Sequence, residues 1–328
     1  MNTKEICKKL SVTTKMLRVY EEGGLIHPQR GENNYRDYSD DDVLKIQLIV
    51  MLRNLGFSVK DIDKIFREKE DHLDSVLYAF YFQLQAIELQ RKQLEENRRN
   101  ITEAINQMLA GDSPVDQVLL QSERPSIYDE VRSRSNFDDM AEDYVERFLK
   151  EDTEYHAGIG EARRFLDGMD RGTKILDAGG GTCYLWKELP DFTDVTIVDN
   201  SLPMLMYARQ NFPAGKRVLK DVLDPVSEEE RHSYDVVIST FLFHHMPYDQ
   251  QRIALQNLID VKKHYGILYI VERFCVDEEE IERSRGRSID YKPLIQEFLD
   301  MVEEMGCQAE VVRVGQFVRC LRITEKRV

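Results

Sequence analysis

The stretch Lys174-Ile-Leu-Asp-Ala-Gly-Gly-Gly-Thr-Cys183 decides the fold of the second half of the chain. A hydrophobic run ends in Asp177, continues into three glycines and leads to Tyr184–Leu189, whose composition predicts a helix. Only glycine lets backbone N–H groups approach a ligand closely, and helix N-termini attract anions. The stretch therefore predicts a strand–turn–helix unit that cradles a nucleotide.

The composition is that of a globular protein with more than one domain. The chain has 328 residues, of which 42% are hydrophobic and 32% are charged. This length exceeds one ordinary core, so we expect two domains. No stretch approaches the roughly 20 apolar residues of a membrane span, and the N-terminus lacks a signal peptide's hydrophobic segment. We therefore expect a cytoplasmic protein without a membrane partner.

The five cysteines are scattered and form no CxxC pair. This spacing argues against a disulfide framework and against a zinc ribbon, and we expect no metal site. They lie at Cys7, Cys183, Cys275, Cys307 and Cys320.

The net charge of −15 is unevenly distributed along the chain. Residues 1–36 carry seven basic and four acidic side chains, whereas residues 111–328 carry 28 basic and 42 acidic ones. An acidic region repels phosphates, so any contact with DNA belongs to the extreme N-terminus.

Two short helices joined by a tight turn are predicted at this N-terminus. Thr3 can cap the first helix, the turn falls at Ser11-Val12, and Thr13 or Thr14 can cap a second helix that runs through Tyr20. This arrangement is typical of a helix-turn-helix, whose second helix enters the major groove.

A turn-rich hairpin at residues 29–38 and two further helices, capped by Ser39 and Ser58, follow. Residues 3–70 closely resemble the MerR family of winged-helix transcription regulators. The resemblance is carried by Met16-Leu-Arg-Val-Tyr-Glu21, Gly24-Leu25, Pro28, Arg30, Tyr35-Arg-Asp-Tyr38 and Leu55-Gly-Phe-Ser58.

The resemblance implies a homodimer on double-stranded promoter DNA, which acts on RNA polymerase indirectly by twisting an over-long spacer. Arg18 can reach base edges or phosphate, while the wing tyrosines and Arg36 suit phosphate hydrogen bonds. Alternatively, Tyr35 and Tyr38 only pack the wing. Val19 stands where the family usually has an aromatic residue, which leaves the promoter sequence open. The predicted DNA-binding residues are Thr14, Lys15, Arg18, Tyr20, Arg30, Tyr35, Arg36 and Tyr38.

A long helix with an apolar seam is predicted over residues 72–110. Its length of roughly 55 Å exceeds a small domain, so it reads as an antiparallel dimerisation coiled coil, again as in the MerR family. Arg91 and Arg98 interrupt the seam, and they either pair with Glu88 or Glu95 or simply face solvent. The helix should end at Ala110–Pro114. The seam comprises Leu73, Leu77, Phe80, Leu84, Ile87, Leu94, Ile101, Ile105 and Met108.

Strand patterns then alternate with helices as in βαβ units of a parallel sheet. The glycine turn and an acid about twenty residues later are compatible with a dinucleotide-binding Rossmann fold. The predicted strands are 174–177, 195–199, 217–221, 234–239 and 266–271, and a final hairpin is predicted at 309–314 and 317–324.

The region 128–325 resembles class I S-adenosylmethionine (SAM)-dependent methyltransferases more closely. The resemblance is carried in order by Phe137-Asp-Asp-Met-Ala141, Tyr144, Ile175–Thr182, Val198–Ser201, Met204, Ala208, Asp221-Val222 and Tyr234–Met246. We thus predict four segments: a mainly α winged-helix DNA-binding domain (1–71), a coiled-coil helix (72–110), a linker (111–127) and an α/β, Rossmann-like class I methyltransferase fold (128–328).

This resemblance implies SAM as the cofactor and assigns roles along the loops. Gly179 and Gly181 pass under its methionine part, and Asp177 orients that loop or meets the amino group. Asp199 binds the ribose hydroxyls and Asp221 the adenine amine. Around these lie Asn200, Ser201 and Leu202, Val222 against the ring, and Ser239 and Thr240 at the methionine end.

For the catalytic group, the sequence offers two candidates. His244 or His245 can act as a general base, although such a pair is often structural. Tyr144, Tyr155 and His156 can cover the cofactor. No Asn-Pro-Pro-Tyr or Pro-Cys motif indicates a nucleic-acid acceptor, which favours a small molecule.

Three functions are compatible with this pattern. The chain is a regulator with an active methyltransferase domain, a regulator whose methyltransferase fold only senses a ligand, or a small-molecule methyltransferase dimerised by its helix-turn-helix part. The intact Arg18, Arg36 and Tyr38 set speaks against the third function.

Overall fold

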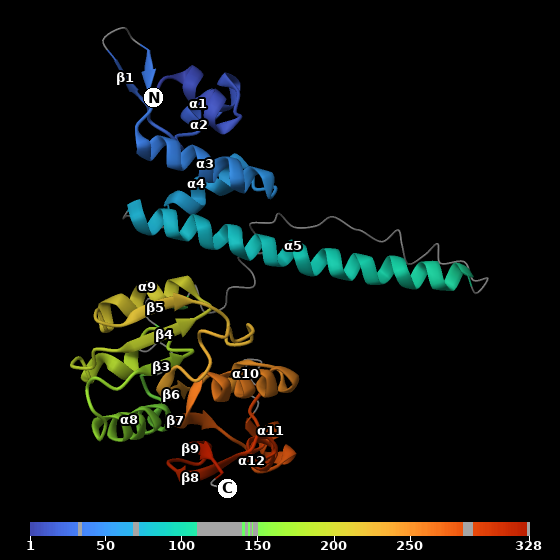
Figure 1. The fold of residues 1–328 in the computed structure, drawn as a ribbon. Helices are drawn as coiled ribbons and strands as arrows, with labels where there is room; N and C mark the ends of the chain where they lie inside the picture. The colour runs from blue at the N-terminus through green and yellow to red at the C-terminus, as the bar shows by residue number, and fades with distance from the viewer. Residues whose placement is uncertain are drawn as a thin grey trace. The chain divides into compact units, whose positions relative to one another are not determined.

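Seven strands of the C-terminal half form one mixed sheet in the computed structural model (Figure 1). Its order is β5-β4-β3-β6-β7-β9-β8, in which β3 to β7 are parallel and β9 is antiparallel to β7 and β8. The α/β class, the parallel strands and the final hairpin are thus confirmed. The strands are β3 (Ile175–Ala178), β4 (Val195–Asp199), β5 (Lys216–Leu219), β6 (Tyr234–Thr240), β7 (Lys262–Arg273), β8 (Cys307–Arg313) and β9 (Val318–Glu325).

The structure describes residues 1–31, 35–67, 72–109, 140–141, 144, 146, 150–284 and 291–326. The chain divides into two units, Met1–Ser135 and Asn136–Val328. The predicted wing tip at 32–34, the helix end at 110–114, the linker at 111–127 and residues 137–139 lie outside the described residues. The finer domain limits therefore stay predictions.

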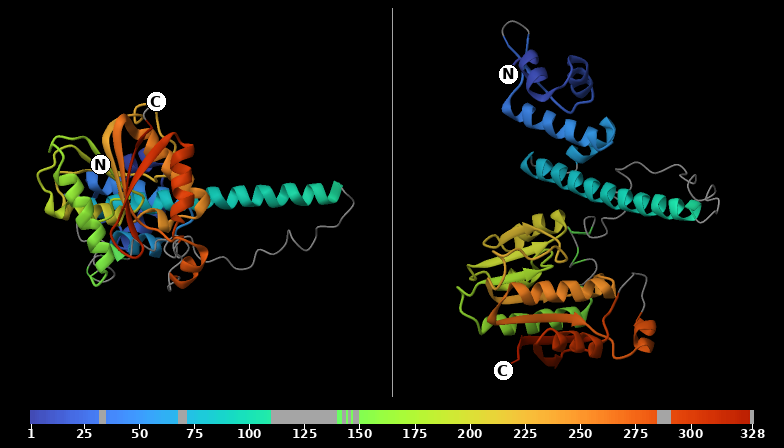
Figure 2. Two further views of the ribbon diagram at one scale, coloured as in Figure 1. Left: turned by 90° about the horizontal axis from the view of Figure 1, so that it is seen from below. Right: turned by 45° about the vertical axis from the view of Figure 1, so that its right-hand side comes forward.

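Successive strand residues point to opposite faces of the sheet, which gives it two apolar faces. Ile175 packs into one core and Leu176 into the other. The first face is covered by α8 (Thr153–Asp167), the 3₁₀ helix η3 (Tyr184–Glu188) and α9 (Leu202–Asn211). The second is covered by α10 (Tyr248–Val261) and α12 (Ile295–Glu304), so the unit has three layers (Figure 2).

The chain changes direction within the sheet between β3 and β6. From β3 it proceeds through β4 to β5 at one edge, then returns to β6 on the other side of β3. In open α/β sheets, ligands bind outside the carboxyl ends of the strands at such a switch point. The glycine loop that follows β3 lies at this end.

The segment after the glycines differs from the expectation. Tyr184–Glu188 forms a five-residue 3₁₀ helix, not an α-helix. Its preceding residue, Cys183, has a left-handed backbone with φ of 61° and provides no side-chain cap. The dipole of a regular α-helix therefore contributes little here, and the loop must be held by other contacts.

The N-terminal unit contains the predicted helix-turn-helix and wing. Helices α1 (Thr3–Leu10) and α2 (Thr14–Glu22) are separated by a turn in which Ser11 has a φ of 54°. The wing is the antiparallel pair β1 (Gln29–Arg30) and β2 (Arg36–Asp37), followed by α3 (Asp40–Asn54) and α4 (Val59–Arg67).

Helix caps in this unit follow the sequence, with one correction. Thr13 caps α2, and Ser39 forms a capping box with Asp42 at the start of α3, both as predicted. The cap of α1 is Asn2 rather than Thr3. The Asn2 side chain accepts a hydrogen bond from the Glu5 N–H, and the Glu5 carboxylate accepts one from the Asn2 N–H.

Helix α5 (His72–Leu109) runs for 38 residues and carries apolar side chains on two faces. One face packs within its own unit, as the contact between the Phe82 and Phe57 rings shows. Arg91 is exposed and pairs with Glu88 and Glu95 of the same helix. The second face is 40–67% exposed and comprises five members of the predicted seam, namely Leu77, Phe80, Leu84, Ile87 and Leu94. The side chains of the other four members, Leu73, Ile101, Ile105 and Met108, lie outside the described part of the chain.

No helix among the described residues is long and apolar enough to cross a membrane.

Candidate functional site

The outer face of α2 presents three of the predicted DNA-binding side chains. Thr14, Lys15 and Arg18 are exposed, while Leu17 on the opposite face is buried. A helix with this division packs by one face and leaves the other for a groove. Exposed Val19 adds an apolar side chain to the same surface.

The wing presents further predicted contacts. Arg30 and Tyr35 are exposed. Arg36 is half-buried, and its Nε donates to a carboxylate oxygen of Glu21 at 2.8 Å. This ion pair ties the wing to α2, so the two elements that carry the predicted contacts are fixed to each other.

Tyr20 and Tyr38 do not fit their predicted role as DNA contacts. Each is only 2% exposed, because Tyr20 lies on the buried face of α2 and Tyr38 lies against α1. Burial raises the pKa of both hydroxyls, and the Tyr38 hydroxyl is hydrogen-bonded to Thr3. In this structure both tyrosines are packing residues. For Tyr38 this is the second of the two roles that the sequence allows.

The glycine loop after β3 adopts backbone conformations that favour glycine. Gly179 and Gly181 have φ of +70° and +51°. A Cβ on Gly179 would lie 2.7 Å from Leu242, and one on Gly180 would lie 2.7 Å from the Asp177 carboxylate. The loop is therefore tightly packed at Gly179 and Gly180, where a side chain would displace it, whereas a Cβ on Gly181 would meet no atom within 4 Å.

Asp199 fixes this loop to the neighbouring strand. Its two carboxylate oxygens accept the N–H groups of Gly181 and Ser201, each at 2.9 Å. The N–H of Gly179 donates to the carbonyl of Val198 at 2.8 Å. One carboxylate thus joins the glycine loop, the end of β4 and the start of α9.

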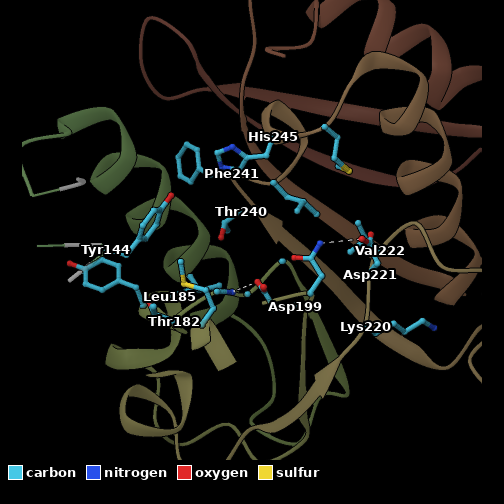
Figure 3. A pocket seen from close by; sticks show the side chains of 18 of the residues that line it. Tyr144, Thr182, Leu185, Asp199, Lys220, Asp221, Val222, Thr240, Phe241 and His245 are labelled. Atoms are coloured by element: carbon cyan, nitrogen blue, oxygen red, sulfur yellow. Dashed lines mark hydrogen bonds between the residues drawn. The ribbon is translucent and has the colours of Figure 1, made fainter. Parts of the chain in front are cut away.

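A cavity of about 280 Å³ opens at the carboxyl ends of β3, β4 and β6 (Figure 3). At one end Asn200 Nδ2 donates to Asp221 Oδ2 at 3.1 Å, and Val222 lies beside them. Of the predicted cofactor-binding residues, the structure places the following at the cavity wall: Gly179, Gly181, Asp199, Asn200, Asp221, Val222 and Thr240.

Four predicted cofactor contacts do not line this cavity: Leu202, which is half-buried at the start of α9, and three buried residues. Ser201 caps α9, with its hydroxyl accepting the N–H of Met204. Ser239 lies within β6 and is fully buried. Asp177 lies under Gly180, where its Oδ2 accepts the indole N–H of Trp186 at 2.7 Å. Of its two predicted roles, the structure favours orienting the loop.

Aromatic rings form the other end of the cavity. Tyr155 packs against Phe241 with ring centroids 4.8 Å apart, and Tyr184 lies 6.2 Å from Tyr155. Phe241 has a φ of +55°, a strained conformation for a residue with a side chain. Tyr144 also lines the cavity, whereas His156 lines an adjoining recess of about 530 Å³. Sequence reasoning missed Phe241 and Tyr184 as wall residues.

The two histidines occupy different environments. His245 lines the cavity, and His244 does not. The buried carboxylate of Glu272 accepts a hydrogen bond from His244 Nδ1 at 2.7 Å. Burial acts to raise the pKa of Glu272, but the charge and hydrogen bonds of His244 outweigh it, so this pKa is lowered. His244 is therefore held in a structural pair, and of the two predicted bases only His245 reaches the cavity.

No group of three or more His, Cys, Asp and Glu side chains suited to a metal ion occurs among the residues that the structure describes.

Residues 1–69 match the family model described as MerR HTH family regulatory protein, and residues 175–266 match that of a methyltransferase domain. Over 117 residues the chain is 32% identical to the HTH-type transcriptional regulator HmrR of Rhizobium leguminosarum bv. viciae. The aligned region covers 35% of this chain and 91% of that protein. The chain is 28% identical over 120 residues to the regulator CueR of Salmonella typhimurium, 35% of this chain and 86% of that protein.

Among solved structures, the chain is similar to magnesium protoporphyrin IX methyltransferase (ChlM) from Synechocystis PCC 6803 with bound SAH. The TM-score is 0.49 at 16% identity, and the match covers 60% of this chain and all of that chain (100%). The fold assignment of the second unit rests on its sheet order and on the methyltransferase domain match.

Asp177→Asn should stabilise the protein increasingly as the pH rises. Burial, with a smaller contribution from the Asp199 charge, raises the pKa of Asp177 to about 7. The pKa of an aspartate in the unfolded chain is about 3.9. The folded state thus favours the protonated form, so the Asp177 contribution to stability is present at pH 4 and is lost as the pH rises through 7. Asparagine cannot ionise and avoids this loss.

Thermal unfolding at pH 5 and pH 8 measures the effect. The melting temperature of Asp177→Asn minus that of the wild type should be larger at pH 8. Asp235→Asn is the control, because the Lys263 hydrogen bond lowers the pKa of Asp235 and its removal should bring no gain at pH 8. A difference for Asp177→Asn that is the same at both pH values would contradict the buried, proton-binding environment.

Proposed function

The chain belongs to the MerR family of helix-turn-helix transcription regulators, and we propose that it binds promoter DNA as a homodimer and SAM in its methyltransferase domain. The observation that carries the proposal is the cavity at the switch point of the sheet, enclosed by a glycine loop and two carboxylates. The methyltransferase domain then acts on a small molecule, and we infer that ligand binding in this domain, by SAM or by that small molecule, is coupled to DNA binding.

The described cavity residues fit SAM chemically. The glycine loop offers backbone close to a ligand, and Asp199 supplies acceptor oxygens suited to ribose hydroxyls. Asp221 is the acceptor for an adenine amine, with Val222 beside it. The rings of Tyr155, Phe241 and their neighbours suit a sulfonium cation, because aromatic faces attract positive charge.

Bound SAM supplies an electrophilic methyl group, so the protein needs chiefly to orient the acceptor and to manage its proton. The aromatic end of the cavity offers flat apolar walls for a small acceptor. The imidazole of His245 is the group at this end suited to take a proton from an acceptor hydroxyl.

In the N-terminal unit, Thr14, Lys15 and Arg18 on α2 enter the major groove, while Arg30, Tyr35 and Arg36 of the wing contact the phosphate backbone. The protein acts on RNA polymerase through the distorted promoter. Two observations support the assignment: all of these side chains except half-buried Arg36 are exposed, and the Arg36–Glu21 pair joins the two elements.

The proposal is tested by calorimetric titration with SAM and with its demethylated product, followed by mass spectrometry of small-molecule extracts incubated with methyl-labelled SAM. Binding and a labelled product are expected for an active methyltransferase. Binding without any product over long incubation would instead identify a ligand sensor, and no binding would contradict the cofactor assignment.

Asp199→Ala should weaken SAM binding by about 3 kcal/mol, because it removes charge-assisted hydrogen bonds and releases the glycine loop. Asp199→Asn should cost nearly as much, since its amide NH₂ would face a backbone N–H of Gly181 or Ser201. Calorimetric titration gives the affinities. Exposed Asp191 provides the control, and an equal loss in Asp191→Ala, or none in Asp199→Ala, would refute the assignment.

Arg36→Ala should weaken binding to all DNA sequences and reduce the slope of log affinity against log salt by about 1, as loss of a phosphate contact does. Fluorescence anisotropy on a duplex at several salt concentrations measures both. Arg67→Ala is the matched control, because Arg67 is also paired with a carboxylate, that of Asp63, but lies outside the wing. Unchanged binding by Arg36→Ala would remove the wing from the interface.

Replacing Leu77 and Leu84 together with Asp should convert the dimer into monomers, because it places charges in the seam. Sedimentation equilibrium reports the mass. Lys92→Asp, on the same helix but outside the seam, should leave the dimer intact. A dimer that survives the double substitution would show that the main interface lies elsewhere.

A further inference from the structure

Glu272 is a fully buried carboxylate at the end of β7 that sequence reasoning did not single out. Transfer of an ionised carboxylate from water into a protein interior is costly unless hydrogen bonds compensate for it. Its Oε2 accepts the N–H of Phe243 at 2.6 Å and lies 3.4 Å from the N–H of His244. Its Oε1 accepts His244 Nδ1 at 2.7 Å and the N–H of Arg273 at 2.6 Å.

These partners lie in one short element, apart from Arg273, which adjoins Glu272. That element is the 3₁₀ turn η4 (Phe243–His245), which follows β6 and carries both histidines. A three-residue turn is not rigid by itself, because it contains few internal hydrogen bonds. Glu272 therefore supplies contacts to both backbone and side chain that fix the orientation of η4.

A second anchor holds the other side of the turn. The buried amide of Gln251 donates to the carbonyls of Phe243 and Met246 at 3.2 and 3.0 Å. The ring of Phe243 packs edge-on against Phe298, with centroids 5.1 Å apart. The turn can thus remain folded when Glu272 is altered, which makes its orientation accessible to experiment.

The orientation of η4 separates the roles of the two histidines. With Nδ1 tied to Glu272, the ring of His244 is buried and stays out of the cavity. The ring of His245 lies against it, with centroids 3.9 Å apart and planes 48° apart, and lines the cavity. Figure 3 shows the His245 side chain at the same end of the cavity as Phe241.

We propose, building on the function proposed above, that Glu272 is a positioning residue, which locks His244 and thereby presents His245 to the methyl acceptor. Glu272 does not line the cavity, so its effect on a bound acceptor passes through η4. The carboxylate is needed as an acceptor on both oxygens, because each faces N–H donors. Glutamine would place an NH₂ group against one of these donors and loosen the turn.

Diethylpyrocarbonate, which modifies neutral imidazoles, tests the positions directly when modified peptides are resolved by mass spectrometry. In the full-length wild type, His245 should be modified and His244 protected, with exposed His264 (65% side-chain exposure) as the internal reference. In Glu272→Gln, the rate at His244 should rise about tenfold, as expected for loss of a charged hydrogen bond.

Two variants of His244 distinguish positioning from general destabilisation. The amide of His244→Asn can replace the Nδ1 donor, so His245 should be modified at the wild-type rate. His244→Ala lacks this donor, and the rate at His245 should change several-fold. These variants also carry the test if Glu272→Gln does not fold.

The outcomes separate this inference from the cofactor assignment. SAM titration of the same proteins should give equal affinities, because Glu272 lies outside the cavity wall. Failure of the wild type to bind SAM would refute the proposed function but leave the labelling result intact. Equal modification of His244 and His245 in the wild type, or identical His245 rates in His244→Asn and His244→Ala, would overturn the positioning role.

Discussion

The two hydrogen bonds accepted by the Asp199 carboxylate are the contacts on which the cavity depends. They fix the glycine loop to β4 and to the start of α9, although Gly179 and Gly181 adopt left-handed conformations that a free chain would leave readily. The regular helix that often stabilises such a loop is replaced here by the short 3₁₀ helix η3. The same carboxylate thus holds the loop and forms part of the cavity wall.

Acids at the ends of buried strands recur around this cavity. Asp177 lies in β3, Asp199 ends β4, and Glu272 comes next to last in β7. Asp199 and Glu272 each accept two or more backbone N–H groups of a following loop or a neighbouring turn, because one carboxylate can satisfy several such donors at once. Asp177 instead accepts the indole N–H of Trp186. The hydrophobic run Ile267–Val271 that precedes Glu272 resembles the runs before the other two acids, so this signal in the sequence could have identified it.

Sequence patterns predicted the sheet well, because short hydrophobic segments that alternate with helical segments leave few alternatives to the strands of a parallel sheet. They did not predict that Tyr184–Glu188 is a 3₁₀ helix, since five residues are too few for a period to appear. Nor could they distinguish exposed from buried tyrosines in the N-terminal unit. Tyr20 is buried by its position on α2, and Tyr38 by the path of the wing, both of which depend on packing between elements.

The two histidines also show that a sequence motif alone does not determine which of its side chains reach a site. His244 and His245 are adjacent in sequence and chemically identical, but His244 is paired with Glu272 of the neighbouring strand β7, while His245 lines the cavity. Likewise, Asp177 and Ser239 stand in strands that lead to the site, but their side chains point into the protein interior. Motif position therefore located the site, while tertiary contacts decided which members of each motif reach it.

The central claim is that one chain couples DNA recognition to cofactor binding. It is tested most directly by titrating SAM into the full-length protein with and without a duplex selected by the protein from a random pool. Because coupling is reciprocal, a regulator that responds to SAM must show a different SAM affinity on DNA, by about fivefold or more. Equal affinities in the two titrations would contradict this coupling and exclude SAM as the signal that the DNA-binding unit reads.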